Sequence, residues 1–228
     1  MGPGPGPTPG YPVVLTVAGR RCLVVGGGPV AARRARSLLD AGAVVTVVAP
    51  RVVSAIEEMA SRPQPGRDDV PPVEVALRPY RHGEGGGFAL VVTATGDLEV
   101  DSSVVADALA AGVPVASAGG DIPGTVGLPA VLRRGRVTVA VSTGGTSPAL
   151  AVWLRDRIDA SLPPGLDTLA TLLDEARAEA RASGRPTDSV DWAALVDDHV
   201  LPLVEAGRVD EARTALRAGW HHHGGAAT

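Results

Sequence analysis

A glycine-rich turn near the start of the chain contains the residue types needed to hold a phosphate group. The sequence Gly26-Gly27-Gly28-Pro29-Val30-Ala31 matches the pattern G-x-G-x-x-G/A at all three fixed positions. Glycine lets the backbone approach a pyrophosphate closely, and a helix that begins there offers free N–H groups and a partial positive charge. The turn therefore predicts dinucleotide binding, with a purely structural tight turn as the alternative.

The residues expected beside the adenosine ribose do not decide between NAD and NADP. The second strand ends in Val47-Val48-Ala49-Pro50-Arg51, with no Asp or Glu to bind the ribose hydroxyls. Arg51 is suited to a 2′-phosphate; alternatively, it is the first residue of a helix and faces water. We take Pro50 and Arg51, together with Thr95 after the fourth strand, as further cofactor-binding candidates.

A second chemically suggestive segment is Ser142-Thr143-Gly144-Gly145-Thr146-Ser147-Pro148. It has the pattern of a strand, a glycine turn and a helix start, in which Thr146 or Ser147 caps the helix and Pro148 takes the first helical position. Free N–H groups at a helix start suit carboxylates, so residues 143–147 are expected to anchor substrate, with plain helix capping as the alternative. Nearby arginines add positive charge suited to carboxylates, or form a solvated face: Arg133, Arg134, Arg136, Arg155 and Arg157.

Asp121 is the one acidic residue in the Gly-, Pro- and Ser-rich stretch 117–129. This stretch follows an expected strand at 113–116, and the segments after parallel strands line the ligand-binding edge of a sheet. A carboxylate there can accept a proton, or it can initiate a turn before Ile122-Pro123-Gly124. On the residues alone, both roles of Asp121 remain open.

Composition excludes several classes of function. All 21 basic residues are Arg, which rules out Schiff-base lysine chemistry and a P-loop lysine. The net charge of −4 argues against a nucleic-acid binder that depends on phosphate contacts. The single Cys22 rules out an intrachain disulfide, and its apolar surroundings favour a buried, inert thiol.

No metal site or membrane span is expected. His82 and His199 have no partners at ligand spacing, and no apolar run reaches about 18 residues. The Gly-Pro alternation of residues 1–10 is typical of a disordered leader and not of a signal peptide, so we expect a cytoplasmic protein. Residues 220–228, with three adjacent histidines, are expected to form a solvent-exposed tail.

Alternating strand and helix patterns predict an α/β protein with a parallel sheet. Strands are expected at 21–25, 43–48, 73–77, 88–93, 113–116, 130–134 and 136–142. Helices are expected at 29–41, 51–61, 101–111, 148–161, 165–182, 189–205 and 208–218. This pattern predicts a Rossmann-type domain over 11–117, a short β dimerisation segment over 118–147 and a small helical C-terminal domain over 148–219. A homodimer is expected because the apolar strand 136–142 needs a partner surface.

Two signatures together resemble a known family. Gly19-Arg20-Arg21-Cys22-Leu23-Val24-Val25-Gly26-Gly27-Gly28-Pro29-Val30-Ala31 is similar to the opening of the precorrin-2 dehydrogenase module of siroheme synthases. Val139-Ala140-Val141-Ser142-Thr143-Gly144-Gly145-Thr146-Ser147-Pro148-Ala149-Leu150-Ala151 resembles its second signature. The pair is specific because generic Rossmann proteins share the first signature and not the second. The resemblance extends over residues 11–165.

The resemblance implies a homodimer that oxidises precorrin-2 to sirohydrochlorin with NAD. In some members of the family the same site inserts ferrous iron to give siroheme. The family's Asn-x-x-Asp-x-Pro stretch corresponds to Ala118-Gly119-Gly120-Asp121-Ile122-Pro123, which keeps the catalytic aspartate and the proline but not the asparagine. The usual Thr-Asp-Asp after the fourth strand is Thr95-Gly96-Asp97 here. A methyltransferase domain would need about as many residues again, so methylation is expected to be done by another protein.

Two alternatives remain open at this point. One is a dehydrogenase that works with a separate chelatase. The other is a non-enzymatic NAD-sensing regulator that kept the fold and lost the chemistry. Turnover of precorrin-2 with NAD separates the regulator from both enzymes, and iron insertion into sirohydrochlorin separates the two enzymes.

Overall fold

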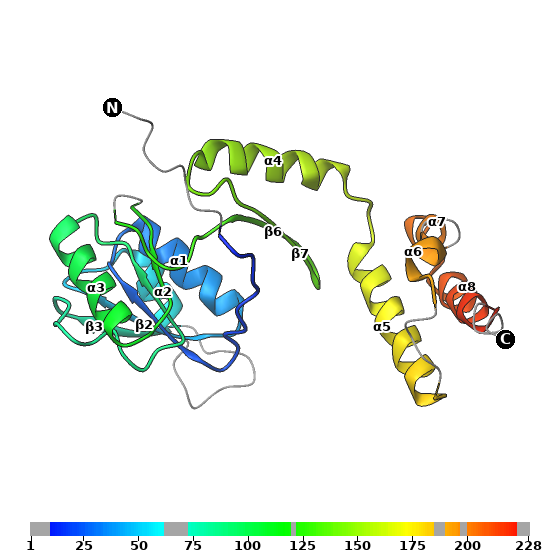
Figure 1. The fold of residues 1–228 in the computed structure, drawn as a ribbon, viewed down its shortest axis with the longest axis horizontal. Coiled ribbons are helices and arrows are strands. Elements are labelled where there is room, and N and C mark those ends of the chain that lie inside the picture. The colour runs from blue at the N-terminus through cyan, green and yellow to red at the C-terminus, as the bar shows by residue number, and fades with distance from the viewer. Residues whose placement is uncertain (1–9, 62–72, 120–121, 185–189, 197–199, 223–228) are drawn as a thin grey trace. The chain divides into compact units, whose positions relative to one another are not determined.

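The computed structural model describes residues 10–61, 73–119, 122–184, 190–196 and 200–222, and for residues 220–222 it describes the backbone only. The chain divides into two compact units (Figure 1). The first unit consists of residues 1–128 and 144–146, and the second of residues 129–143 and 147–228.

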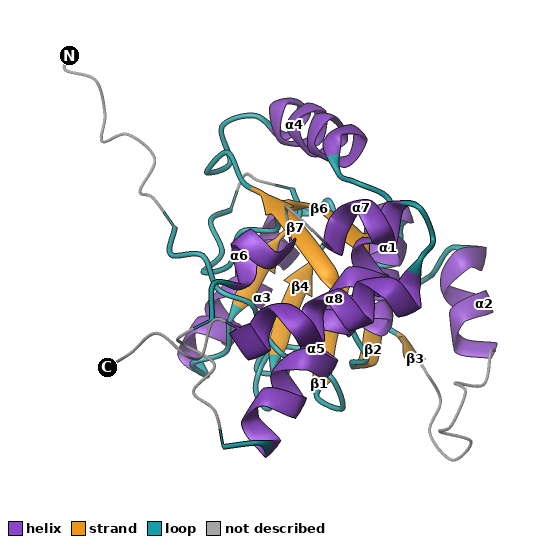
Figure 2. Cartoon of the chain, turned by 90° about the vertical axis from the view of Figure 1, so that its right-hand side faces the viewer, coloured by secondary structure: helices purple, strands orange, loops and turns teal. Residues whose placement is uncertain are grey.

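The first unit is built on a five-stranded parallel sheet, as the alternating pattern predicted. Its strands are β1 (Arg21–Val25), β2 (Val44–Ala49), β3 (Val73–Leu77), β4 (Leu90–Thr93) and β5 (Val115–Ser117). Their order across the sheet is β3-β2-β1-β4-β5. Figure 2 labels the first four strands of this order, from β3 to β4. In the central part of the sheet Val24 is paired with Val47 of β2 and with Val92 of β4. The chain order reverses direction at β1, and this is where ligands bind in open parallel sheets.

Alternate residues of β1 supply the two faces of the sheet. Cys22 and Val24 belong to a buried apolar cluster with α1 (Pro29–Asp40) and α2 (Ser54–Ser61). Leu23 and Val25 belong to the cluster on the other face, with α3 (Leu98–Ala110). Both faces are therefore covered, which explains the nearly continuous apolar runs of these strands. The prediction that Cys22 is buried is confirmed, and burial raises the pKa of its thiol.

Several helix boundaries differ from those expected. The helix predicted over 51–61 begins only at Ser54, and the helix predicted over 101–111 begins at Leu98. The earlier start of α3 has a clear cause: Oδ1 of Asp97 accepts hydrogen bonds from the N–H groups of Glu99 and Val100. The predicted helix 189–205 contains two short helices, α6 (Trp192–Leu195) and α7 (Leu201–Glu205), and α8 (Val209–His222) runs past the expected end at 218.

The second unit opens with an antiparallel hairpin of β6 (Ala130–Arg134) and β7 (Val137–Val141). Gly135 makes the turn at φ +56°, a left-handed conformation that favours glycine. The turn contacts the start of α5 (Leu166–Ala182), where the N–H of Arg136 donates to Oδ1 of Asp167 at 2.9 Å. Helix α4 (Pro148–Ser161) packs against both strands of the hairpin.

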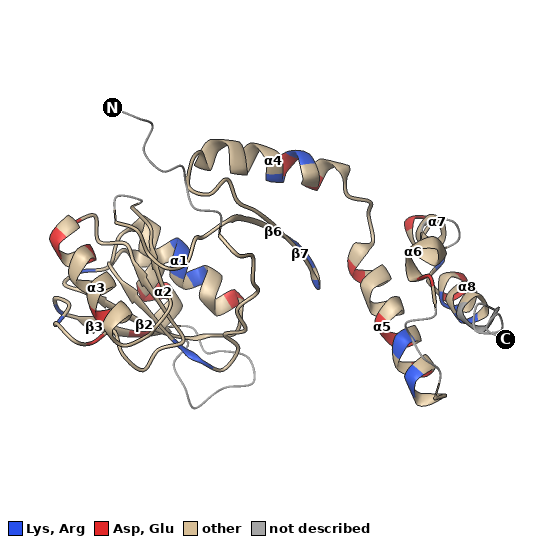
Figure 3. Cartoon of the chain, in the orientation of Figure 1, with Lys and Arg blue, Asp and Glu red and all other residues tan. Residues whose placement is uncertain are grey.

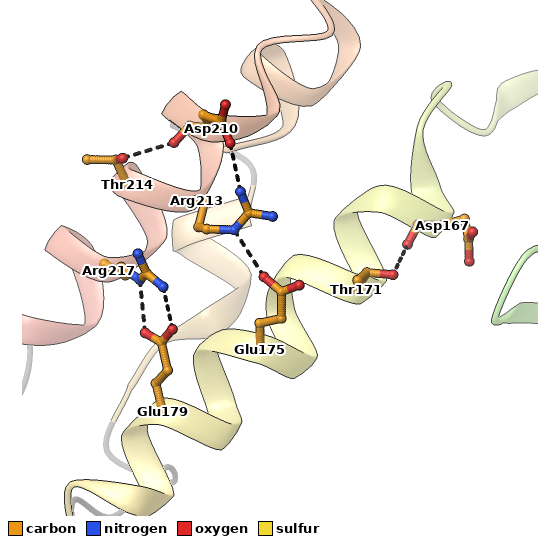
Figure 4. Close-up of polar contacts among 8 residues, drawn as sticks. All are labelled: Asp167, Thr171, Glu175, Glu179, Asp210, Arg213, Thr214 and Arg217. Atoms are coloured by element: carbon orange, nitrogen blue, oxygen red, sulfur yellow. Dashed lines mark hydrogen bonds and ion pairs between the residues drawn. The ribbon is translucent and has the colours of Figure 1, made fainter.

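The remaining helices of this unit form a small apolar core. Its fully buried members include Leu172 of α5 and Leu216 of α8. Ion pairs flank this seam between α5 and α8 (Figure 4), with Arg213 at 3.1 Å from Glu175 and Arg217 at 2.5 Å from Glu179. No helix within the described ranges is both long and apolar enough to cross a membrane.

Candidate cofactor and substrate site

A cleft of about 740 Å³ opens in the first unit at the carboxyl ends of the parallel strands. Four connections contribute to it: the glycine turn after β1, the segment between β2 and α2, and the segments after β3 and β4. The lining residues are Val25, Gly26, Gly27, Gly28, Val48, Ala49, Pro50, Arg51, Val52, Val53, Pro79, Tyr80, Thr95, Asp97 and Val100. A cleft of this size and position is suited to a dinucleotide.

The three glycines of the turn have different surroundings. Gly26 has φ +127°, and a Cβ there would lie 2.4 Å from the carbonyl oxygen of Ala94. A Cβ on Gly27 would lie 1.8 Å from the carbonyl oxygen of Arg51. At Gly28, by contrast, a Cβ would meet no protein atom within 4 Å. The first two glycines therefore let backbone segments touch, while Gly28 leaves open space in the cleft.

The start of α1, directly after the lining residue Gly28, leaves two backbone donors without a partner within the helix. Gly28 is the N-cap and provides no side-chain hydrogen bond, and Pro29 occupies the first turn without an N–H. The N–H of Ala32 donates to the carbonyl of Gly28, so the N–H groups of Val30 and Ala31 have no partner within the helix. The first turn carries no acidic residue. This combination fits the pyrophosphate of a nicotinamide dinucleotide.

The cleft brings most of the predicted cofactor residues together. Gly26, Gly27, Gly28, Pro50, Arg51 and Thr95 line it, whereas Pro29 and Val30 lie at the start of α1 outside its lining. Arg51 is exposed and precedes α2 by three residues, so the interpretation of Arg51 as a helix residue was wrong. Within the described ranges, no carboxylate pairs with its guanidinium group.

Thr95 is held by a buried carboxylate that sequence reasoning missed. Oδ1 of Asp101, in the first turn of α3, accepts from the N–H of Thr95 at 3.2 Å and from its hydroxyl at 2.7 Å. The same oxygen accepts from the hydroxyl of Thr93 at the end of β4. Asp101 is 4% exposed, so it joins the strand, the cleft wall and the helix in one network. No sequence motif singles it out, because its partners lie six and eight residues away.

Pro79 and Tyr80 also line the cleft and were not predicted. They follow β3, where the sequence has no recognisable binding motif. Tyr80 donates a hydrogen bond to the buried Asp107 of α3 at 2.8 Å. Nδ1 of His82 lies 2.8 Å from the same carboxylate, which gives this histidine a structural partner.

The second signature forms a capped helix start, as one of its two interpretations predicted. Oγ of Ser147 accepts from the N–H of Leu150 at 3.2 Å, so Ser147 and not Thr146 caps α4. The hydroxyl of Thr143 donates to the carbonyl of Ser147 at 3.0 Å. Gly144 and Gly145 both have positive φ, and they form the turn between β7 and α4.

Most of the nearby arginines are paired with carboxylates. Arg134 lies 2.6 Å from Asp159, Arg136 lies 3.0 Å from Asp174, and Arg155 lies 2.6 Å from Asp156. The guanidinium of Arg157 stacks over the ring of Trp153 at 5.2 Å. In Figure 3 the charged residues of α4 lie toward its C-terminal end, away from the capped start. Of these five arginines, Arg133 alone has neither an ion pair nor a ring contact among the described residues.

Asp121 and His199 lie outside the residues that the structure describes. Among the described residues, no group of three or more His, Cys, Asp or Glu side chains could hold a metal ion.

Both signatures lie in segments that match known protein families. Residues 13–130 match a family described as putative NAD(P)-binding, and residues 134–161 match the family described as sirohaem biosynthesis protein central. The precorrin-2 dehydrogenase SirC superimposes with a TM-score of 0.67 at 26% identity, covering 92% of this chain and 99% of that chain. The chain belongs to the siroheme synthase and precorrin-2 dehydrogenase family.

Relatives within this family include much longer proteins. Siroheme synthase 1 of Halorhodospira halophila is 36% identical over 210 residues, which are 90% of this chain and 42% of that protein. The siroheme synthase of Azotobacter vinelandii is 39% identical over 209 residues, which are 91% of this chain and 43% of that protein. The chain thus spans about two fifths of the length of these curated relatives. The resemblance inferred from the two signatures is confirmed, as is the Rossmann-type architecture.

Proposed function

We propose that the chain catalyses the NAD-dependent oxidation of precorrin-2 to sirohydrochlorin. The observation that carries this proposal is the glycine-lined cleft at the head of α1, in a chain that matches a precorrin-2 dehydrogenase over 99% of that protein's length. The experiment that tests it is turnover of precorrin-2 with NAD by the purified protein, followed through the absorbance of sirohydrochlorin.

The residues of the cleft would hold the cofactor by its phosphates. The N–H groups of Val30 and Ala31 would donate to the pyrophosphate, and Gly28 would let it approach the backbone. Thr95, whose hydroxyl donates to Asp101, lines the cleft after β4, whereas Pro50 and Arg51 line it after β2. When bound, the nicotinamide supplies a hydride acceptor. We propose NAD as the cofactor on the basis of the family resemblance. Arg51, which has no carboxylate partner among the described residues, makes NADP the comparison to measure.

Oxidation of a macrocycle also needs an acceptor for the proton that leaves with the hydride. We propose Asp121 for this role, because it is the aspartate that corresponds to the family's catalytic residue. A positioned carboxylate can take the proton or stabilise a charged intermediate of the substrate. The same carboxylate is suited to removing pyrrole N–H protons when ferrous iron, as a second substrate, enters sirohydrochlorin.

The turn before α4 is our proposed anchor for the substrate's carboxylates. Precorrin-2 carries eight carboxylates, and a helix start favours negative charge. Ser147 already caps the N–H of Leu150, so we propose the backbone of Gly145 and the side chain of Thr146 as the donors to substrate. Loss of substrate affinity without loss of NAD affinity in a Thr146→Val variant would support this role, and an unchanged substrate KM would contradict it.

We further propose that the chain forms a homodimer through the hairpin of its second unit. Leu132 is the one buried residue of β6, and β7 has no buried residue. The apolar residues Leu150, Val152 and Trp153 of α4 are 42–54% exposed. A two-stranded ribbon with so little buried surface is marginal by itself. Sedimentation velocity at micromolar concentration is expected to show a dimer, and a stable monomer would contradict it.

A further inference from the structure

The segment between β3 and β4 packs on α3 through one buried carboxylate. Oδ2 of Asp107 accepts a hydrogen bond from the hydroxyl of Tyr80 at 2.8 Å and from the N–H of Gly83 at 2.7 Å. Its Oδ1 lies 2.8 Å from Nδ1 of His82. The Asp107 side chain is 5% exposed while His82 is 84% exposed, so the carboxylate gathers three partners from a surface segment. A buried carboxylate is costly unless it is satisfied in this way.

The same segment is closed on itself by further contacts. Arg78 and Glu84 pair at 2.8 Å across its ends, and the hydrogen bond from Arg78 lowers the pKa of Glu84. Gly85 lies so close to α3 that a Cβ there would come within 2.9 Å of the backbone nitrogen of Ala108. The segment from Arg78 to Gly85 therefore has a fixed path over α3, although it contains neither helix nor strand.

Tyr80 is the residue of this segment that connects it to the cleft. It lines the cleft together with Pro79 and Val100, and it packs against the apolar cluster between the sheet and α3. Burial and the hydrogen bond to Asp107 raise the pKa of Tyr80, so its hydroxyl stays protonated and keeps donating. Because the hydroxyl is bound, the position of the ring is determined by Asp107.

The place of Tyr80 in the sheet order indicates which half of the cofactor it meets. The adenosine ribose of a dinucleotide lies at the end of the second strand of such a sheet. Strand β3 is the neighbour of β2, on the side away from β1. The residues after β3 thus lie on the adenosine side of the glycine turn, and Tyr80 is the one aromatic residue among the described residues that line the cleft.

We propose that Tyr80 is the aromatic wall of the adenosine half of the cofactor site, and that Asp107 is the positioning residue that holds it there. This inference rests on the proposed function only in taking a nicotinamide dinucleotide as the ligand. An aromatic face against a base contributes through stacking, and truncation of such a ring typically costs about tenfold or more in affinity.

The test is calorimetric binding of two fragments of the cofactor to the full chain. ADP-ribose carries the adenosine half, and nicotinamide mononucleotide does not. We expect Tyr80→Ala to weaken ADP-ribose binding by about tenfold and nicotinamide mononucleotide binding by less than about twofold. Tyr80→Phe keeps the ring and is expected to lose only about threefold. The matched control is Phe88→Ala, which removes an aromatic ring from the same apolar cluster but from outside the cleft lining.

The role of Asp107 is tested by rescue. Asp107→Ala is expected to weaken ADP-ribose binding nearly as much as Tyr80→Ala, and Asp107→Asn, which retains an acceptor, to restore part of it. In turnover assays the KM for NAD is expected to rise by a larger factor than kcat falls. Should Asp107→Ala fail to fold, Asp107→Asn and Tyr80→Phe still measure the effect of disturbing this contact.

Three outcomes would overturn the proposal. One is an ADP-ribose affinity that is unchanged in a Tyr80→Ala variant of wild-type thermal stability. Another is an equal loss for both fragments, which would show a general structural effect. The third is a loss as large in Phe88→Ala as in Tyr80→Ala. Failure of the proposed function is distinguishable from all of these. A wild-type chain that binds NAD and ADP-ribose but does not oxidise precorrin-2 would overturn the proposed function and leave the role of Tyr80 standing, whereas a wild-type chain that binds neither NAD nor ADP-ribose would overturn both.

Discussion

The carbonyl oxygen of Arg51 lies where a side chain at Gly27 would have to begin. A Cβ on Gly27 would come within 1.8 Å of that oxygen, and the N–H of Val53 donates to the carbonyl of Gly27 at 2.9 Å. The glycine turn and the segment between β2 and α2 therefore meet through bare backbone. Gly28, the next residue, faces open space in the cleft. Gly27 is thus fixed by backbone packing, while Gly28 borders the open space of the cleft.

Because of these different surroundings, valine at Gly28 and valine at Gly27 are expected to have different effects. Gly28→Val is expected to fold with nearly wild-type thermal stability and to lose NAD affinity by more than about tenfold, because the side chain fills the space of the pyrophosphate. Gly27→Val is expected to lose the fold itself. Gly127→Val is the control, since a Cβ there also meets nothing within 4 Å but lies outside the cleft lining. Unchanged NAD affinity in folded Gly28→Val would refute the assignment of the turn.

The network around Asp101 predicts a stability effect that depends on one oxygen atom. Asp101→Ala leaves the hydroxyls of Thr93 and Thr95 and the N–H of Thr95 without their acceptor, so the free energy of unfolding is expected to fall by about 2–3 kcal/mol. Asp101→Asn keeps an acceptor at Oδ1 and is expected to lose less. Denaturant titration measures both, with exposed Asp40→Ala as the control, expected within about 0.5 kcal/mol of wild type. Equal losses in the Asp40 and Asp101 alanine variants would contradict the network.

The hydrogen bond from Tyr80 to Asp107 predicts a loss of stability at alkaline pH. Because the pKa of Tyr80 is raised in the folded chain, its contribution is fully present below the usual tyrosine value of about 10 and is lost as the pH rises through the raised value. The difference in unfolding free energy between wild type and Tyr80→Phe is therefore expected to shrink above about pH 10. A difference that stays constant from pH 8 to pH 12 would show that the hydroxyl does not donate in this way.

Substitution of Asp121 is expected to reduce the oxidation of precorrin-2 without reducing the affinity for NAD. Asp121→Asn keeps the shape of the side chain and removes its charge, so oxidation of precorrin-2 is expected to fall by roughly 10²–10⁴-fold while NAD affinity is retained. Iron insertion, assayed in the same variants, is expected to fall with it if one carboxylate serves both steps. If Asp121 merely starts a turn, Asn substitutes well and turnover stays near that of wild type, which would retire the catalytic role.

The sequence was most informative where several local signals agree. The run from Arg21 to Val25, the three glycines and the helical spacing after Pro29 all specify one strand, one turn and one helix. A local pattern of this kind determines its own geometry, so the cleft around Gly26, Gly27 and Gly28 could be predicted. The same kind of reasoning placed the cap of α4 at Thr146 or Ser147, since Pro148 marks the first helical position, and the structure has Ser147 as the cap.

The parts that were missed depend on contacts between distant residues. Tyr80 and Asp107 are 27 residues apart and meet only because the segment after β3 crosses α3. Asp101 looks in sequence like an ordinary acidic residue in the first turn of a helix, and only burial against Thr93 reveals its role. The start of α2 was misplaced because Arg51 belongs to the backbone contact with Gly27, which holds residues 50–53 out of the helix.

The most direct test of the account is anaerobic turnover of precorrin-2 by the purified chain with NAD, measured by both products. Oxidation removes a hydride and a proton from the macrocycle, so we predict one NADH formed for each sirohydrochlorin, with the yield abolished in Gly28→Val. NADP in place of NAD is expected to support slower turnover. A wild-type chain that binds NAD but forms neither NADH nor sirohydrochlorin would contradict the account and favour a cofactor-sensing protein.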